Sequence, residues 1–269
     1  LKNDNTQGEY YITDVIGIMR KKGLKIGAFK IKNAEEILGV NNRYQLSEAN
    51  KIMQRRIVKK LMLEGVTIID PDSTYIDASV TVEKDVTIYP GCIIEGNTVI
   101  QEDSVIGPYS RIKDAKIDRG VKIQNSVVLE SSIGEGTSIG PFAYLRPGNK
   151  IGKHAKVGDF VEMKNSTFGD NSKASHLTYV GDGDVGSNVN LGCGVVFVNY
   201  DGKNKYRTYV GDNSFVGCNV NLVAPVRVNE NTYVAAGTTV TKDVPQDSLA
   251  IGRARQENKE GWVTKRKNK

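Results

Sequence analysis

The sequence predicts an all-β protein built as a parallel β-helix, in which short strands wind into stacked coils. The main observation is an apolar residue at every sixth position between Ile76 and Val240, with occasional one-residue slips. A helix repeats its faces about every 3.6 residues and a single strand about every 2, so neither element explains this period. If each hexad supplies one strand and one turn, and three hexads make a coil, each apolar residue stacks on its counterpart in the next coil.

The predicted inward residues fall into four groups, and the spacing shortens to five residues before Ile117, Phe168 and Val185. They are Ile76, Val82, Ile88, Ile94, Ile100, Ile106, Ile112, Ile117 and Ile123; Ile133, Ile139, Leu145, Ile151, Val157 and Met163; Phe168, Ala174, Val180, Val185 and Leu191; and Val210, Val216, Leu222, Val228, Val234 and Val240. A second observation supports them, because small or β-branched residues follow many of them four positions later. Examples are Val80, Val86, Thr98, Ser104, Ala143, Ala155 and Val161.

The composition is that of a globular protein without a membrane segment. Charged residues make up 25% of the 269 residues, and the mean hydropathy is −0.37. The sequence has no apolar run long enough to cross a bilayer and no signal-peptide pattern at its start, so no membrane insertion is expected. Three scattered cysteines, Cys92, Cys193 and Cys218, do not form a disulfide framework, which favours a cytoplasmic location.

The net charge of +6 is concentrated at the C-terminal end of the chain. Residues 251–269 carry seven basic and two acidic side chains, a balance of +5, so the remaining residues contribute only +1. These residues are predicted to form a basic C-terminal tail that is solvated and can meet a polyanion such as a cofactor phosphate. A nucleic-acid partner is not expected.

Residues 1–45 have a pattern unlike the rest. Ile12, Val15, Ile16 and Met19 form one apolar helical face that ends at Gly23, and residues 24–31 alternate weakly as a strand would. The segment is too short for a core of its own. It is predicted to be the C-terminal remnant of an α/β domain.

A long linker helix is predicted within residues 46–69. It is expected to begin at Ser47 as N-cap, to end at Glu64, and to be closed by Gly65. The β-helix domain is then predicted over residues 70–250. An insertion of eighteen residues, 192–209, interrupts the hexads after Leu191. Loops inserted into a solenoid commonly carry its function.

Two histidines are available for chemistry. His154, between two nearby lysines in an ordinary hexad, is interpreted as a surface residue. His176 lies among hydroxyl side chains and is the candidate for a functional role, because imidazole titrates near neutral pH. Two histidines cannot supply the three imidazole ligands of a carbonic-anhydrase zinc site.

Several short motifs occur together and in a fixed order. They are LRPG at 145–148, VEMK at 161–164, the segment around His176, NVN at 188–190, NYDGKNK at 199–205 and VAPV at 223–226. Together they resemble the acetyltransferase half of the bacterial bifunctional family of N-acetylglucosamine-1-phosphate uridylyltransferases and glucosamine-1-phosphate N-acetyltransferases. Residues 7–14 and 39–43 resemble the end of that family's uridylyltransferase domain, so the resemblance covers essentially the whole chain.

The resemblance implies a left-handed β-helix and a soluble homotrimer with active sites between subunits, in which Trp262 packs on a neighbour. It implies an enzyme that transfers acetyl from acetyl-CoA to the amine of glucosamine-1-phosphate, without an acyl-enzyme. The product would serve UDP-N-acetylglucosamine synthesis, and through it peptidoglycan and the cell envelope.

The resemblance also assigns site residues by position. The implied catalytic residues are His176 as general base, Glu162 as its orienting carboxylate, and Asn199, which positions the amine. The implied substrate-binding residues are Arg146, Lys164, Tyr179, Asn190 and Lys205. The implied acetyl-CoA contacts are Cys193, Tyr200, Cys218, Ala236 and Arg253, with a backbone N–H near Tyr200 as oxyanion donor.

The uridylyltransferase half of this family needs a glycine-rich phosphate loop and an acidic metal ligand, and neither occurs in this sequence. Asn41 matches a magnesium and nucleotide contact, but one ligand cannot build a magnesium site. The chain is therefore expected to lack uridylyltransferase activity, and Mg²⁺ is expected only with the missing half.

Each motif also has a structural interpretation. Residues 199–202 have turn-forming composition, residues 146–148 suit a coil corner, and Glu162 with Lys164 suits a surface ion pair. Three rival functions stay open: a hexapeptide-repeat acyltransferase with another amine or hydroxyl acceptor, a mechanism with a cysteine nucleophile, and a purely structural β-helix.

Overall fold

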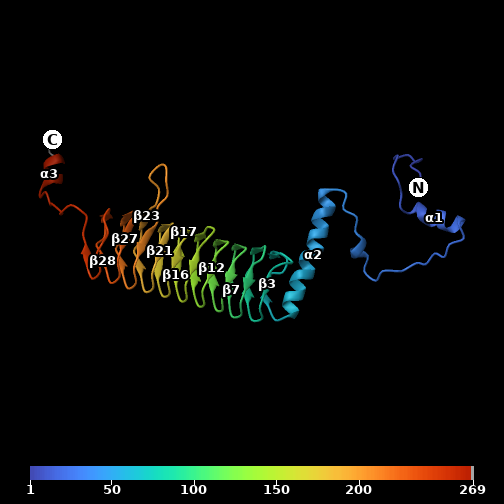
Figure 1. Cartoon of the computed structure of the whole chain (residues 1–269), viewed down its shortest axis with the longest axis horizontal. Helices are drawn as coiled ribbons and strands as arrows, with labels where there is room; N and C mark the ends of the chain where they lie inside the picture. Colours follow the sequence, from blue (N-terminus) through green and yellow to red (C-terminus); the bar gives the residue numbers. More distant parts are fainter. Residues whose placement is uncertain (268–269) are drawn as a thin grey trace. The chain divides into compact units, whose positions relative to one another are not determined.

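The computed structural model describes residues 1–267 (Figure 1). Backbone contacts divide the chain into two units, Leu1–Ile52 and Met53–Lys269, which are described separately below. Helix α2, Arg43–Leu63, runs from the first unit into the second. The predicted basic tail extends to Lys269, and its last two residues lie outside the described part of the chain.

The first unit contains helix α1, Asp14–Lys21, and the short 3-10 helix η1, Ala34–Ile37. The predicted apolar helix is present and ends before Gly23, whose φ is +68°. The predicted strand at 24–31 is wrong, because these residues pair with no other strand and Phe29 is 92% exposed. Helix α1 buries none of its residues, so this unit has apolar side chains but no core around them. Its membership in a larger domain stays a prediction.

Helix α2 begins one turn earlier than predicted. The side chain of Asn42 accepts a hydrogen bond from the backbone N–H of Gln45 at 2.9 Å, and the Gln45 side chain accepts one from the N–H of Asn41 at 2.7 Å. This reciprocal arrangement satisfies N–H groups that the first turn leaves unpaired. Asn42 is therefore the N-cap, and Ser47 lies inside the helix.

The second unit is the predicted parallel β-helix. In the described residues its strands form three parallel sheets of eleven, ten and nine strands, called here sheets A, B and C. Neighbouring strands of a sheet are three places apart along the chain, except that β28 pairs with β30 at the end of sheet A. Sheet A contains β1 Thr67–Ile68, β4 Thr87–Ile88, β7 Val105–Ile106, β10 Lys122–Ile123, β13 Ser138–Ile139, β16 Lys156–Asp159, β19 Lys173–His176, β22 Asn190–Leu191, β25 Phe215–Val216, β28 Tyr233–Val234 and β30 Leu249–Ala250.

The other two sheets follow the same order. Sheet B contains β2 Tyr75–Ile76, β5 Ile93–Glu95, β8 Arg111–Lys113, β11 Val127–Leu129, β14 Tyr144–Leu145, β17 Glu162–Lys164, β20 Tyr179–Gly181, β23 Val196–Val198, β26 Asn221–Val223 and β29 Thr239–Val240. Sheet C contains β3 Thr81–Val82, β6 Val99–Ile100, β9 Lys116–Ile117, β12 Ser132–Ile133, β15 Lys150–Ile151, β18 Thr167–Phe168, β21 Gly183–Val185, β24 Thr208–Val210 and β27 Val226–Val228. Helix α3, Trp262–Lys267, follows the solenoid.

The core is a column of stacked apolar side chains inside the coils. Ile88, Ile106 and Ile123 lie in register on successive strands of sheet A, and all three are buried. Every residue of the predicted inward series is buried, as are the small residues predicted four positions later. Burial of each large aliphatic side chain contributes about 1.5–3 kcal/mol, so the repeat itself stabilises the solenoid.

The insertion predicted at residues 192–209 is shorter in the structure. Phe197 lies in register with Leu222 and is fully buried, so residues 192–198 form an ordinary part of a coil. The prediction missed this position because it ended the count at Leu191, although Phe197 stands six residues further along. The inserted loop is therefore residues 199–207, between β23 and β24. The solenoid also begins earlier than predicted, because β1 at Thr67 already pairs with β4.

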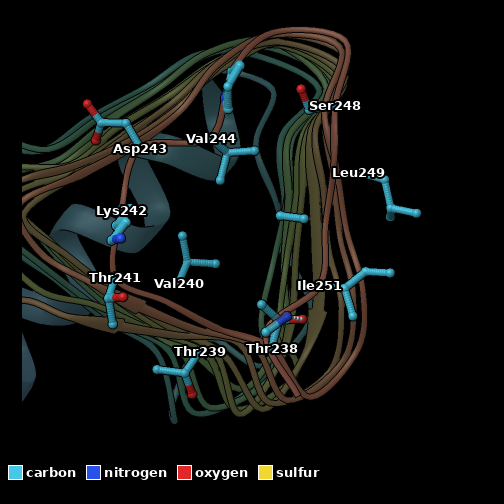
Figure 2. Close-up of a pocket in the computed structure, with 13 residues that line it drawn as sticks. Thr238, Thr239, Val240, Thr241, Lys242, Asp243, Val244, Ser248, Leu249 and Ile251 are labelled. Carbon is cyan, nitrogen blue, oxygen red and sulfur yellow. Dashed lines mark hydrogen bonds between the residues drawn. The ribbon is translucent and has the colours of Figure 1, made fainter. Parts of the chain in front are cut away.

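The two ends of the solenoid differ. At the N-terminal end, Val58 and Leu61 of α2 are buried in the core, and the Gln54 side chain bonds both backbone groups of Ile76, with N–O distances of 3.0 and 3.2 Å. This amide supplies the partners that a further strand would give to an exposed sheet edge. The C-terminal end is open in the described chain, and Figure 2 looks into it toward Val240.

Candidate active site

The predicted site residues gather at two of the three corners of the solenoid. Corner AB is the turn that joins a strand of sheet A to the next strand of sheet B, and corner BC joins sheet B to sheet C. His176 is the last residue of β19 and lies at corner AB. Lys164 is the last residue of β17 and lies at corner BC.

The centre of the cluster at corner BC is Asp182, a residue that the motifs did not single out. The residue is 6% exposed, and its carboxylate accepts hydrogen bonds from the side-chain amides of Asn199 at 2.6 Å and Asn165 at 2.7 Å. The ammonium of Lys164 lies 3.8 Å from it. Asp182 occupies the same corner position as Asn165 one coil before and Asn199 one coil after. The sequence signal that could have found it is this spacing of seventeen residues between corner residues.

Corner BC gathers positive charge. The neighbouring Lys205 amine lowers the pKa of Lys164, and desolvation lowers it further, while Asp182 acts in the opposite direction. Arg146 directly follows β14, the adjacent strand of the same sheet, and forms an ion pair of 3.0 Å with Glu162, which raises the pKa of the guanidinium. Three cations lie near two carboxylates here, so the cluster suits an anion such as a phosphomonoester.

Gly181 makes room for the neighbouring side chains of this cluster. A Cβ atom built at Gly181 would overlap the hydroxyl of Tyr179 and lie 2.8 Å from Asn199 Nδ2. The phenol of Tyr179 therefore lies across Gly181 and points toward corner BC. Of the predicted residues, the structure brings together Arg146, Glu162, Lys164, Tyr179, Asn199 and Lys205.

The loop 199–207 is held in a defined shape. Its tip is a turn in which Asp201 accepts the backbone N–H groups of Lys203 and Asn204 at 2.7 and 2.6 Å. At its base, Arg207 forms a two-pronged ion pair with Asp184 of β21, at 2.6 and 3.0 Å. The loop therefore is a turn, as its composition predicts, and its anchored base holds Lys205 beside Lys164.

Corner AB carries a second column of predicted residues. Asp159 and His176 are register partners, and Asp159 Oδ1 lies 2.8 Å from His176 Nδ1. This contact fits a tautomer in which Nδ1–H donates to the carboxylate and Nε2 stays available as a base. The hydrogen bond of Asp159 to its own backbone, with a further contribution from His176, lowers the pKa of the carboxyl.

Within one chain Glu162 does not contact His176, so its predicted orienting role stays a prediction. The Glu162 carboxylate is paired with Arg146 on sheet B, whereas the imidazole of the same chain is held by Asp159 on sheet A. Sequence reasoning passed over Asp159 because it lies seventeen residues before His176, the length of one coil.

The predicted acetyl-CoA contacts continue the column at corner AB. Cys193, Cys218 and Ala236 each lie two residues beyond a register position of sheet A, on successive coils after His176. Arg253 joins them, because its guanidinium donates to the carbonyl of Ala236 at 2.8 Å. Both thiols are free, Cys193 half-buried and Cys218 exposed. Small side chains thus leave a strip beside the imidazole that ends at an arginine.

Two predicted residues lie apart from the groups assigned to them. The resemblance assigns Tyr200 to acetyl-CoA, but Tyr200 lies in the loop at corner BC, where its hydroxyl donates to the carbonyl of Gly202 at 2.6 Å. The resemblance assigns Asn190 to the sugar phosphate, but Asn190 lies on sheet A beside Lys173, on the side of His176. His154 is exposed, as predicted.

Within one chain the two corners stay separate. Strand β20, Tyr179–Gly181, lies between them, and three residues of strand extend about 10 Å. The base and the cationic cluster of a single chain therefore lie at opposite edges of sheet B. The hollow in Figure 2 lies elsewhere, at the open end of the last coil, and is lined by none of the predicted site residues.

The structure gives no support for a metal in this part of the molecule. In residues 1–267 no three His, Cys, Asp or Glu side chains gather as metal ligands would. Asn41 stands alone, with its backbone N–H bonded to Gln45, so the described residues do not fit a magnesium ion.

No helix within residues 1–267 is long and apolar enough to span a bilayer.

Comparison with known proteins identifies the repeats and the relatives of this chain. Residues 79–114 and 207–242 match the family described as bacterial transferase hexapeptide (six repeats). The chain is 59% identical to the bifunctional protein GlmU of Clostridium botulinum (strain Loch Maree / Type A3) and 60% identical to that of Acetivibrio thermocellus. Each match covers 99% of this chain and 58% of the relative.

A solved structure supports the fold alone. A crystal structure of a UDP-N-acetylglucosamine acyltransferase matches with a TM-score of 0.51 at 20% identity, over 69% of this chain and 71% of that one. The resemblance predicted from the motifs is confirmed by the closer relatives. This chain is a homologue of the bifunctional GlmU proteins over nearly all of its own length and over 58% of theirs, with the hexapeptide repeats of a bacterial transferase.

Proposed function

We propose that this chain transfers the acetyl group of acetyl-CoA to the amine of glucosamine-1-phosphate. The observation that carries the proposal is the cationic cluster at corner BC, formed by Arg146, Lys164 and Lys205 beside the amide of Asn199. When these cations bind the phosphate, the amine of the sugar lies within reach of the Asn199 amide at the same corner. The relatives' name supports this reading, although the chain spans only 58% of their length.

His176 serves as general base in the proposed reaction. Asp159 holds Nδ1, so Nε2 accepts a proton as the sugar nitrogen attacks the thioester carbonyl. The carbon–sulfur bond of the tetrahedral intermediate then breaks, the new amide forms, and coenzyme A leaves as a thiolate that takes up a proton. The strip of Cys193, Cys218, Ala236 and Arg253 holds the acetyl-CoA. A backbone N–H near Tyr200 stabilises the oxyanion.

The proposed active site is shared between subunits of a homotrimer. A single chain turns its base and its cationic cluster to opposite edges of sheet B, so one chain cannot offer both to the same small sugar. In a closed cyclic assembly, corner BC of one subunit meets corner AB of the next. Glu162 then belongs to the site of the neighbouring base, which preserves its proposed orienting role across the interface. Trp262, half-exposed in the described chain, is proposed to pack on the same neighbour.

The remaining assignments follow from the same homology. We propose a left-handed solenoid, a cytoplasmic location, and a product that feeds UDP-N-acetylglucosamine and peptidoglycan synthesis. Residues 1–45 are proposed to complete a uridylyltransferase domain, and magnesium would act there rather than on the solenoid.

The direct test measures thiol release from acetyl-CoA in the presence of glucosamine-1-phosphate, with the wild type and His176→Ala. The wild type should release coenzyme A, and the variant should be slower by about 10²–10⁴-fold, the usual contribution of a general base. Undiminished release in the variant would refute the proposed base. A folded wild type that acetylates only another amine or a hydroxyl would establish the rival acyltransferase. A folded wild type without any acyl transfer would favour the structural role.

A further inference from the structure

We propose that Asp182 is a positioning residue that turns the amide of Asn199 and keeps the phosphate-binding lysines charged. This inference rests on the proposed function and adds to it a buried carboxylate that touches neither sugar nor acetyl-CoA. Three observations carry it: the pair of amide donors, the nearby ammonium groups, and the absence of backbone donors among the hydrogen bonds to its oxygens in the described chain.

The first step concerns the orientation of two amides. An ionised carboxylate offers only acceptors, so a side-chain amide that meets it must present its NH₂ group. Asn165 donates to Oδ1 and Asn199 donates to Oδ2 of the same carboxylate. The carbonyl oxygen of Asn199 must then point away from Asp182. That oxygen is the acceptor that can hold an N–H of the sugar amine while its lone pair faces the thioester.

The second step concerns charge. Lys164 and Lys205 approach each other closely enough that Lys205 lowers the pKa of Lys164, and Arg146 adds to the same effect. Asp182 is the carboxylate that opposes them, and its own pKa is lowered despite its burial by the two amides and the two lysines. Removing its charge would leave two repelling ammonium groups, and Lys164 would release its proton at a lower pH.

A purely structural role for Asp182 is the alternative. Carboxylates at other corners serve such a role: Asp170 accepts the backbone N–H of Lys153 at 2.7 Å, and Asp212 accepts that of Ser187 at 2.8 Å. These bonds hold one coil on another. Asp182 instead accepts from side chains that belong to the proposed site, so its loss should affect the reaction more than the coil.

The test compares Asp182→Asn with Asp170→Asn as the matched control, on the full chain. An asparagine at 182 keeps one acceptor oxygen, so the Asn199 amide no longer has a fixed orientation. We expect kcat to fall about 10²-fold, the cost of a small misplacement near the reacting groups. We also expect the KM for glucosamine-1-phosphate to rise at a lower pH than in the wild type, because Lys164 loses its proton earlier. Asp170→Asn should keep wild-type kcat and the wild-type pH profile.

Two further variants keep the test decisive. Asp182→Glu retains the charge and should restore the pH profile of KM even where kcat stays low. In a double-mutant cycle, Asp182→Asn should have little further effect on kcat once Asn199→Ala is present, because the two residues act as a unit. Full additivity with Asn199→Ala, together with an unshifted pH profile, would overturn the inference. If Asp182→Asn does not fold, the Asp182→Glu profile and its cycle with Asn199→Ala decide the matter by the same criteria.

Failure of this inference is distinguishable from failure of the proposed function. A wild type that does not acetylate glucosamine-1-phosphate contradicts the proposed function. A wild type that does so, with Asp182→Asn behaving like the Asp170→Asn control, contradicts the role of Asp182 alone.

Discussion

Two individually inactive variants should restore activity when they assemble together, because the base and the cationic cluster lie at different corners of one chain. His176→Ala removes the base at corner AB and leaves corner BC intact, whereas Lys164→Ala does the reverse. A mixed trimer contains a junction at which an intact cluster of one copy meets an intact base of the next.

The expected magnitude follows from counting junctions. In a cyclic trimer with two copies of one variant and one of the other, only one of the three junctions joins an intact cluster to an intact base. Both possible mixtures give the same count. Mixed trimers should therefore show about one third of wild-type kcat, with an unchanged KM, because the restored site is built from unaltered groups.

The assay uses co-expression of the two variants with different affinity tags. Purification on both tags selects mixed assemblies, and thiol release from acetyl-CoA with glucosamine-1-phosphate measures their activity. Each variant purified alone gives the background, and sedimentation shows whether each is a trimer. Mixed trimers that are no more active than either variant alone would refute the shared site, as would a folded monomer with full wild-type activity.

Other predictions concern the solenoid and the surroundings of the site. Gln54→Ala leaves two backbone groups of the first coil without partners and should lower the free energy of unfolding by about 1–3 kcal/mol, measured by urea denaturation; an unchanged midpoint would contradict this capping role. Gly181→Ala should reduce kcat about 10²-fold while the melting temperature stays near that of the wild type, because the added methyl group displaces flexible side-chain ends rather than backbone. Cys193 and Cys218 lie one coil apart, about 4.8 Å, within the range of disulfides. A low-molecular-weight disulfide such as oxidised glutathione should therefore convert both thiols to an internal bridge that dithiothreitol reverses, and mass spectrometry that finds only separate glutathione adducts would contradict it. Asp184 has its pKa lowered by its arginine partner, so its stabilising contribution is present above the unfolded value of about 3.9 and is lost as the pH falls toward the lower folded value. Asp184→Asn should accordingly flatten the fall of the melting temperature below about pH 4, and an equally steep fall would exclude this contribution.

The sequence alone predicts the solenoid because its core is periodic. Each coil must place apolar side chains on the same inward positions, so the six-residue repeat appears directly in the order of residues such as Ile88, Ile106 and Ile123. The same repetition limits the errors to places where the pattern is interrupted. Phe197 is one such place, because it fills the last inward position before the inserted loop, where the count had already ended.

The motifs also indicated most members of the candidate site, but not how those members are grouped. Residues such as His176 and Lys164 stand close in the sequence, yet a strand of sheet B separates their corners. Conversely, Asp159 and His176 are separated by more residues but lie in register on neighbouring strands. Corner residues such as Asn165, Asp182 and Asn199 belong to no apolar repeat, so only the length of a coil shows which of them meet.

The sequence by itself therefore determined the architecture, the family and the types of residue that carry the proposed chemistry. The tertiary structure decided which carboxylate serves which group: Asp159 holds the imidazole, Glu162 pairs with Arg146, and Asp182 binds Asn199. The physical reason is that apolar burial acts on every repeat alike and so leaves a regular pattern. Polar contacts form between individual atoms on different coils, so the winding of the chain decides which polar groups come within hydrogen-bonding distance.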